Sequence, residues 1–254
     1  MGKIIAMVNQ KGGVGKTTSA VNLAAALGAK GKRILLCDID PQGNSTSGLG
    51  VNKKELQGSS YDVLVNQVPA KEIILQTPYQ NVFIMPSNME LAGAELELAM
   101  QEKRENRLKN ALALVRDDFD FIFFDCPPSL GLITINALTA ADTILVPIQC
   151  EYYALEGLSQ LVTTVRTVKR VYNPYIEMEG VLLTMYDGRL NLTQQVVDEI
   201  KRCFPKKVYS TVIPRNVRLS EAPSYGQPVI YYDKSSKGSA AYMALADEFL
   251  SRNR

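Results

Sequence analysis

Short apolar runs and longer amphipathic stretches alternate along most of the chain. The apolar runs occupy residues 4–8, 34–37, 82–85, 121–124, 142–147, 180–184 and 208–213. The amphipathic stretches occupy residues 89–101, 107–115, 155–172, 192–203 and 239–250. Apolar runs of about four to eight residues predict buried strands, and the longer stretches predict helices. The alternation predicts an α/β fold whose mostly parallel, twisted sheet is covered by helices on both faces.

Length and composition favour a single domain that covers residues 1–254. Of the 254 residues, 46% are hydrophobic and 21% are charged, so the chain can bury a large core. No linker or repeat divides it, and no apolar run approaches the roughly 20 residues that a bilayer span needs. The first strand and the loop after it leave no room for a signal peptide. We therefore expect a cytoplasmic protein.

The segment between the first apolar run and an alanine-rich stretch has the composition of a phosphate-binding loop. Its glycines allow backbone N–H groups to point into a concavity that holds the β- and γ-phosphates of a nucleotide. Lys16 brings a positive charge to the same oxygens, and the Thr17 hydroxyl can complete a Mg²⁺ shell at the start of the next helix. The expected nucleotide contacts are Lys11, Gly12, Gly13, Val14, Gly15, Lys16, Thr17 and Thr18.

The loop departs from the usual pattern G-x-x-x-x-G-K-[ST] at its first position. Gln10 stands where that pattern has glycine, and Lys11 follows it. A cation at this end of the loop cannot easily reach the phosphates held by its own loop, but it can reach those of a second copy. This placement predicts a dimer formed across two nucleotides. The motif K-G-G-x-G-K-[ST] resembles the deviant phosphate loop (deviant Walker A motif) of the ParA/MinD ATPases.

Two later strands end in carboxylates. Asp38 and Asp40 follow the run at 34–37, and Asp125 follows the run at 121–124. The carboxyl ends of parallel strands are where ligands bind in α/β sheets. An acid at a strand end is often only a turn former, but three motifs in the expected order favour a site. Asp125 is therefore interpreted as the Walker B residue, which holds Mg²⁺ directly or through water.

The family resemblance assigns the catalytic roles. It implies that Asp40 orients or activates the attacking water and that Asp38 lies beside the metal and Lys11. It also implies that Lys16 and a partner's Lys11 stabilise the departing γ-phosphoryl group. A carboxylate near Mg²⁺ and two lysines should stay ionised, which agrees with this assignment. The chain has no histidine, so Ser–His and Cys–His schemes and His-ligated metals are excluded.

The four cysteines are far apart in the sequence and form no C-x-x-C pair. They are Cys37, Cys126, Cys150 and Cys203. Three of them adjoin apolar runs, which favours buried reduced thiols over zinc or disulfides. The nitrogenase iron protein family shares the deviant loop and bridges its dimer with an iron–sulfur cluster. Cys126 lacks a convincing partner for such a cluster, so we expect none.

The segments 147–157 and 213–223 extend the resemblance over essentially the whole chain, to the chromosomal ParA proteins, also called Soj. The resemblance implies that Pro214 and Asn216 lie against adenine, whose edge an Asn amide can satisfy. It further implies a slow, Mg²⁺-dependent ATPase that forms an ATP-bridged homodimer, binds double-stranded DNA nonspecifically and is stimulated by a ParB-type protein. Such a protein would be associated with the nucleoid.

The charge distribution bears on DNA binding more than the net charge of +2 does. Residues 166–218 hold ten Lys or Arg against five Asp or Glu, a local excess of five positive charges. Gathered on one face, these groups could hold DNA phosphates without reading bases. Arg189 and Arg218 match basic positions that the family uses, so they are the expected DNA contacts. The alternative for each basic residue is a solvated surface position.

Three relatives of this class remain as alternatives. A MinD-like division-site ATPase attaches to membranes by a basic amphipathic C-terminal helix, whereas the tail at 240–254 has acids in its middle and an apolar side suited to packing. A bacterial tyrosine kinase would show a tyrosine-rich flexible tail, whereas Tyr225, Tyr231 and Tyr232 lie among strand and turn signals. The longer plasmid-type relatives carry an N-terminal helix-turn-helix that this chain does not show. We expect no stable membrane anchor.

Overall fold

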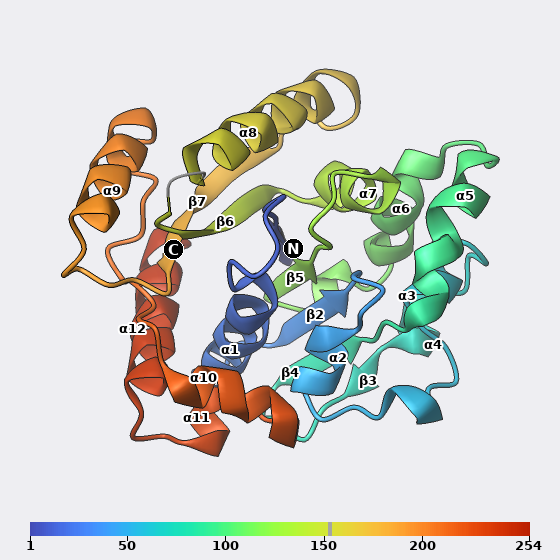
Figure 1. The fold of residues 1–254 in the computed structure, drawn as a ribbon. Coiled ribbons are helices and arrows are strands. Elements are labelled where there is room, and N and C mark those ends of the chain that lie inside the picture. Colours follow the sequence, from blue (N-terminus) through green and yellow to red (C-terminus); the bar gives the residue numbers. More distant parts are fainter. Residues whose placement is uncertain (152–153) are drawn as a thin grey trace.

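A twisted sheet runs through the middle of the structure, a computed structural model that describes residues 1–151 and 154–254 (Figure 1). Its strands are β1 (Lys3–Met7), β2 (Ile34–Asp38), β3 (Leu75–Gln76), β4 (Val82–Met85), β5 (Phe121–Asp125), β6 (Thr143–Gln149) and β7 (Glu177–Thr184). Their order across the sheet is β3-β4-β2-β5-β1-β6-β7. All neighbours are parallel except β3, which pairs with β4 in the antiparallel direction. The predicted fold class is confirmed.

Helices cover both faces of the sheet (Figure 1). The α-helices are α1 (Lys16–Ala29), α2 (Asn44–Gly48), α3 (Ser60–Leu64), α4 (Ala70–Ile73), α5 (Ala94–Ala99), α6 (Arg107–Ala113), α7 (Leu132–Ala140), α8 (Ala154–Val171), α9 (Asn191–Cys203), α10 (Val217–Glu221), α11 (Val229–Tyr232) and α12 (Lys237–Arg252). Single 3₁₀ turns are η1 (Lys53–Glu55), η2 (Met89–Gly93), η3 (Arg104–Asn106), η4 (Arg116–Asp118) and η5 (Ala222–Tyr225).

Strand β1 shows how the sequence builds two core layers. Its side chains alternate between the faces of the sheet, and they are apolar on both. Ile4 and Ala6 join the cluster under α3 and α5–α9, whereas Ile5 and Met7 join the cluster under α1, α11 and α12. A strand buried on both faces reads as an unbroken apolar run, which is why the pattern predicted it correctly.

Two predicted elements differ from the structure. The predicted helix at 89–101 is instead the 3₁₀ turn η2 followed by the short helix α5, with Gly93 at the junction. The predicted strand at 208–213 is wrong, because this segment makes only one isolated bridge to the edge of the sheet, between Val208 and Val181. The backbone N–H groups of Ser210 and Thr211 donate to the Glu248 carboxylate of α12, at 2.8 Å each, and not to a strand.

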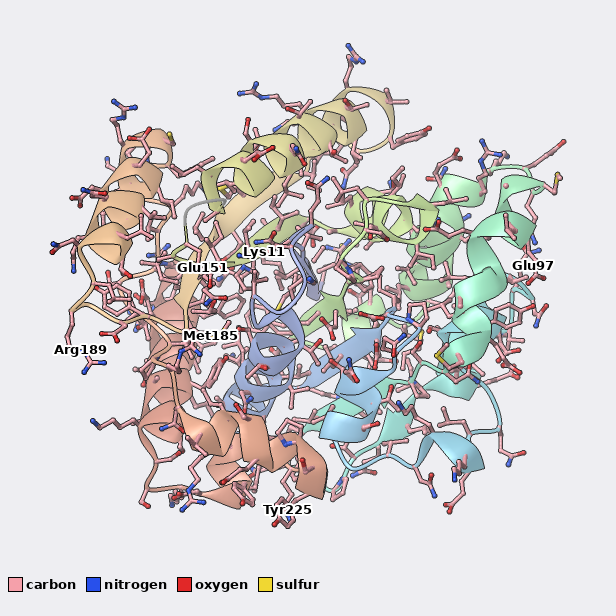
Figure 2. All side chains as sticks on the ribbon, in the orientation of Figure 1. Lys11, Glu97, Glu151, Met185, Arg189 and Tyr225 are labelled. Atoms are coloured by element: carbon pink, nitrogen blue, oxygen red, sulfur yellow. The ribbon has the colours of Figure 1, made fainter. Side chains whose placement is uncertain are left out.

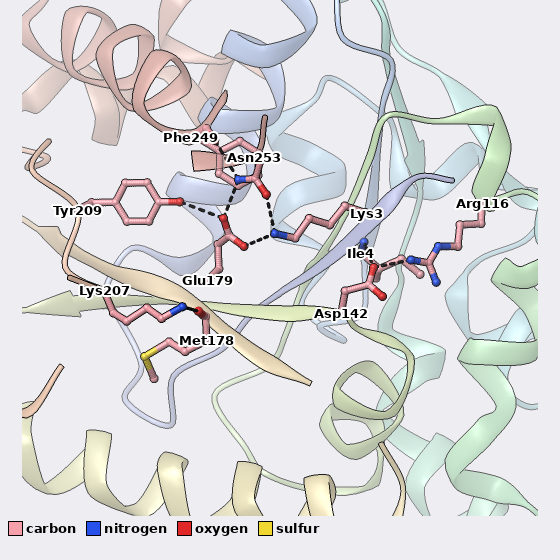
Figure 3. Close-up of polar contacts among 10 residues, drawn as sticks. All are labelled: Lys3, Ile4, Arg116, Asp142, Met178, Glu179, Lys207, Tyr209, Phe249 and Asn253. Atoms are coloured by element: carbon pink, nitrogen blue, oxygen red, sulfur yellow. Dashed lines mark hydrogen bonds and ion pairs between the residues drawn. The ribbon is translucent and has the colours of Figure 1, made fainter. Parts of the chain in front are cut away.

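The C-terminal helix α12 packs into the core and does not project from it. Its Phe249 ring lies 5.1 Å from the Phe121 ring and 5.7 Å from the Phe123 ring, between centroids, and is fully buried. The end of the helix is held at the start of β1 and β7 (Figure 3). There the buried Glu179 carboxylate accepts from Lys3 Nζ at 2.5 Å and from Asn253 Nδ2 at 2.7 Å.

The three tyrosines weighed above for a kinase tail also lie in folded elements. Tyr225 belongs to η5, and Tyr231 and Tyr232 belong to the short helix α11, so the expected strand signal there is wrong. The ring centroids of Tyr225 and Tyr232 stack at 5.0 Å, and those of Tyr231 and Tyr79 lie 4.8 Å apart. None of the described helices combines the length and apolar composition needed to cross a bilayer.

Candidate functional site

A cavity of about 900 Å³ opens at the carboxyl ends of the central strands. Its walls come from the loop after β1, the loop after β2, the loop after β5, and the segment after β7 with residues 213–216. Cavities of this size hold drug-sized or nucleotide-sized ligands. The topology alone places these loops together, because parallel strands direct their following loops to one edge of the sheet.

The loop between β1 and α1 forms one wall. Gly12, Gly13 and Gly15 line the cavity together with Lys16, Thr17 and Thr18. Gly13 and Gly15 have backbone φ angles of 73° and 83°, which residues other than glycine rarely adopt. A Cβ atom at Gly12 or Gly13 would meet open space. The backbone of the loop is therefore bare toward the cavity. It leads directly into the first turn of α1, where unpaired N–H groups favour an anion.

Two side chains from other elements fix this loop. Thr184, at the end of β7, donates its hydroxyl to the Val14 carbonyl at 2.7 Å, and both residues are buried. Asn9 donates to the Pro147 carbonyl at 2.8 Å and accepts from the Lys11 backbone N–H at 3.0 Å. These bonds tie the loop to β6 and β7, so its conformation is set before any ligand binds.

Lys16 lies at the base of the loop and is largely buried. Its amino group donates to the Lys11 carbonyl at 3.2 Å. Burial lowers the pKa of Lys16, while the charge of Asp125 acts in the opposite direction. An anion that reaches this ammonium group interacts with it strongly, because folding has already removed most of the water around the charge.

Asp38 and Asp125 lie on adjacent strands and are completely buried. Burial raises the pKa of both carboxyl groups, and the charge of Asp125 raises that of Asp38 further. Ser45 donates to Asp125 Oδ2 and Thr46 donates to Asp38 Oδ2, each at 2.7 Å. Asp125 Oδ1 has no hydrogen-bond partner among the described residues. Two buried acids with an open oxygen fit a nearby cation.

This arrangement fits a Mg²⁺ ion that is coordinated mainly by water and phosphate oxygens. The described residues contain no group of three or more His, Cys, Asp or Glu side chains placed to hold a metal. Mg²⁺ commonly takes only one or two protein ligands and completes its octahedron with phosphates and water. Asp125, through its free oxygen, and Thr17, whose side chain acts to lower the pKa of Asp125 and lines the cavity, are the groups that could hold it.

Asp40 and the predicted adenine contacts line the same cavity. Asp40 Oδ1 accepts from the Gln42 backbone N–H at 2.9 Å. This hydrogen bond orients the carboxylate within the loop after β2, which lines the cavity. Pro214 and Asn216 line the opposite part. Asn216 Oδ1 is buried without a partner in the described part of the chain, so it is open to a donor such as the adenine amino group.

Lys11 is not among the residues that line the cavity, and its label lies beside that of Glu151 in Figure 2. Its amino group forms an ion pair with Glu151 of the same chain, beyond β6. Both side chains are partly exposed, so the pair is open to exchange. This geometry agrees with a lysine that does not serve its own phosphates. The segment 147–157 that contributed to the family resemblance includes Glu151 and also residues 152 and 153, which lie outside the described residues.

The basic residues counted in the sequence do not gather on one face. Lys207 donates to the Met178 carbonyl near the start of β7. Arg189 and Arg218 lie beyond the opposite, carboxyl end of this strand, where the bridge between Tyr186 and Pro214 joins their two segments. Arg189 is exposed and labelled in Figure 2. The structure therefore brings the two expected DNA contacts to the cavity end of the molecule and separates them from Lys207.

The cysteines are all free thiols. Cys37, Cys126 and Cys150 are buried, as expected, whereas Cys203 is exposed on α9. Burial raises the pKa of Cys126 well above its ordinary value, which makes it a poor thiolate ligand.

Sequence reasoning missed four groups that shape the site: Ser45, Thr46, Thr184 and Glu151. Two hydroxyls directly after the D-x-D-P-Q-G-N run gave a usable signal, because short polar residues at a helix start often bond to nearby acids. The contacts of Thr184 and Glu151 gave none, because they join residues 170 and 140 positions apart.

The fold, the bare glycine loop and the strand-end acids define a P-loop nucleotide hydrolase with a deviant loop. A family model described as an AAA domain matches residues 2–178. The sporulation initiation inhibitor protein Soj of Bacillus subtilis is 58% identical over 98% of each chain. The chromosome partitioning protein ParA of Myxococcus xanthus is 51% identical, over 100% of this chain and 89% of its own length. The chain belongs to the ParA/Soj family of ATPases.

A solved structure of similar fold supports the expected ligands. Cobyrinic acid a,c-diamide synthase from Mycobacterium smegmatis, with bound ADP and magnesium, has a TM-score of 0.85 and 38% sequence identity to this chain, over 98% of this chain and 94% of its own. A related fold at this identity therefore binds an adenine nucleotide and magnesium. ATP and Mg²⁺ are the ligands that the cavity described above fits.

Proposed function

We propose that this protein is a partition ATPase in which ATP binding and hydrolysis switch DNA association on and off. The observation that carries the proposal is the single cavity lined by the phosphate loop, Asp40 and the segment with Pro214 and Asn216. Each part matches one portion of Mg-ATP: backbone N–H groups and Lys16 for the phosphates, Asp125 for the metal, and Asn216 for the base. The names of the Soj and ParA relatives support a role in chromosome partitioning.

The residues of the chain would perform hydrolysis mainly by positioning and charge neutralisation. Lys16 and the loop N–H groups hold the β- and γ-phosphate oxygens. Mg²⁺, when bound, supplies further positive charge to these oxygens. Asp40 accepts a proton from the attacking water, and this hydrogen bond directs a lone pair of the water oxygen at phosphorus. The Gln42 N–H holds the Asp40 carboxylate in the cavity wall, so hydrolysis depends on the conformation of the loop after β2.

The dimer would form across two nucleotides. In the monomer Lys11 pairs with Glu151, and in the dimer it would leave this exposed partner for the phosphates held by the other subunit. Lys11 from the other subunit supplies positive charge that two facing nucleotides would otherwise lack. A low free-running rate follows, because a switch needs a long-lived ATP state and a ParB-type activator to end it.

DNA would bind through Arg189 and Arg218, which the dimer presents twice. Nonspecific binding to phosphates needs exposed cations and no base readout. The MinD-like alternative requires a free amphipathic C-terminal helix, whereas the apolar side of α12 is occupied by the core through Tyr242, Leu245 and Phe249. This packing favours DNA over a membrane surface as the partner, and with it a nucleoid location.

The test compares DNA and membrane binding in each nucleotide state. A random-sequence 30-base-pair duplex and anionic liposomes are each titrated with protein in the presence of ATP, ADP or no nucleotide, over a salt series. We expect ATP-dependent duplex binding that weakens steeply with salt, and no liposome binding. Arg189→Glu and Arg218→Glu should each reduce duplex affinity and flatten the salt dependence. Liposome binding without duplex binding would contradict the proposal and support the MinD-like alternative.

A further inference from the structure

Each expected DNA contact is already bound by acids of its own chain. Arg189 donates Nε to Asp187 Oδ1 at 2.8 Å and Nη2 to Asp187 Oδ2 at 2.6 Å. This two-pronged geometry is also the one by which arginine grips a phosphate. Arg218 donates Nη1 to Glu221 Oε2 at 2.7 Å, and its Nε lies 3.1 Å from Asp233 Oδ2. The guanidinium groups are therefore occupied by carboxylates in the positions that phosphates would take.

These side chains form one arginine patch, defined as Arg189, Arg215 and Arg218 with Asp187, Glu221 and Asp233. The bridge between Tyr186 and Pro214 brings its two segments together. The hydrogen bonds from Arg189 hold the pKa of Asp187 at about 2, and the charge of Arg215 contributes, so Asp187 stays ionised. Arg215 has no ion pair of its own among the described residues. Three cations and three anions leave the patch with no net charge.

We propose that Asp187 and Glu221 are built-in competitors of DNA phosphates, which keep the affinity of the arginine patch for DNA low. The inference rests on the proposed DNA-binding function and names a means of its regulation. Both ion pairs are partly exposed to solvent, and such pairs contribute little free energy, so phosphates can displace the carboxylates. Each displacement leaves an acid close to the DNA backbone, where it repels phosphate. The acids thus make binding weak and rapidly reversible without removing it.

The two acids should differ in strength. Asp187 accepts two hydrogen bonds from the Arg189 guanidinium and also interacts electrostatically with Arg215, so its neutralisation frees Arg189 and removes a negative charge near Arg215. Glu221 shares Arg218 with Asp233, so its neutralisation leaves one acid in place. In Asp187→Asn the side-chain amide oxygen can still accept from the Arg189 backbone N–H, as Asp187 Oδ1 does at 3.1 Å, which preserves the turn.

The experiment measures binding to a random-sequence 30-base-pair duplex with ATP and Mg²⁺ present, over a salt series, for Asp187→Asn, Glu221→Gln and the control Glu199→Gln. Glu199 forms an ion pair of the same kind with Arg202 on α9, at 2.6 Å. We expect Asp187→Asn to bind about threefold to thirtyfold more tightly, because a dimer removes two competitors. Glu221→Gln should show a smaller gain. The salt dependence should steepen in both, and Glu199→Gln should match the unsubstituted protein.

The failure of this inference differs from the failure of the proposed function. If the unsubstituted protein binds duplex with ATP and Asp187→Asn binds equally or more weakly, Asp187 supports the loop and does not compete, and the inference is overturned alone. An equal gain in Glu199→Gln would also overturn it, because the effect would then be general electrostatics. If no variant binds duplex in any nucleotide state, the proposed function and this inference fall together.

Discussion

Replacing Thr184 by Val should weaken ATP binding although Thr184 is not a phosphate ligand. The substitution keeps the shape of the side chain and removes only the hydroxyl that donates to the Val14 carbonyl at 2.7 Å. Thr184 is 2% exposed and Val14 is 1% exposed, so water cannot replace the lost donor while the loop keeps its conformation. The free loop can relax and expose the carbonyl, whereas the nucleotide-bound loop cannot. The penalty therefore falls mainly on the bound state.

The size of the effect follows from the cost of a buried, unpaired carbonyl. Such a group costs about 1–3 kcal/mol, which corresponds to roughly a fivefold to hundredfold loss of ATP affinity. Isothermal titration of the Thr184→Val variant with ATP and Mg²⁺ measures it. The matched control is Thr139→Val on α7, whose buried hydroxyl also donates to a carbonyl at 2.7 Å, but to Ile135 within the same helix and away from the loop. We expect the control to bind ATP normally.

An unchanged ATP affinity in Thr184→Val would refute the reasoning that the loop is fixed from β7. An equal loss in Thr139→Val would refute it as well, because the effect would then report general loosening of the core.

Two further predictions concern the phosphate site and the polar contacts at the other edge of the sheet. Lys16→Ala should abolish ATP binding in the same titration, because it removes the buried cation beside the phosphates; unchanged affinity would rule out the phosphate-loop assignment. Glu179→Gln should lower the melting temperature at pH 7 by roughly 4–8 °C, from about 2 kcal/mol for a buried pair whose Lys3 side chain is 30% exposed. Burial acts to raise the pKa of Glu179, but hydrogen bonds from Lys3 and Asn253 outweigh it and hold the pKa below its ordinary value. The stabilisation is therefore complete above the ordinary glutamate pKa of about 4.3 and is lost as the pH falls through the lowered one. Thermal melts should show the difference between the two proteins shrinking below about pH 4, and a difference that grew there would contradict the assignment.

The sequence predicted best what depends on neighbours in the chain. The phosphate loop and the strands before Asp38 and Asp125 are local patterns, and parallel topology brings them to one edge of the sheet. The prediction of a strand at 208–213 was wrong because a residue far away in the chain determines the structure there. Its apolar residues favour a strand, but the Glu248 carboxylate, more than thirty positions away, takes two of its N–H groups. No local propensity reports such a competitor.

The site shows the same division. The types of residue needed for phosphate, metal and base could be chosen from the sequence, whereas the state of their side chains could not. Lys11 forms an ion pair with Glu151, and Arg189 forms one with Asp187. Both pairs depend on side-chain rotamers and packing, which the sequence does not report. They change the functional account, because both cations must leave an internal partner before they act on another molecule.

ATP should join two subunits through Lys11, and light scattering after size-exclusion chromatography measures this association as a change in molecular mass. The Asp40→Ala variant is used because it should bind ATP without turning it over. We predict the mass of a dimer with ATP and of a monomer with ADP. Adding Lys11→Ala to that variant should leave ATP binding in place and return the mass to that of a monomer. A full ATP-dependent dimer without Lys11 would contradict the account.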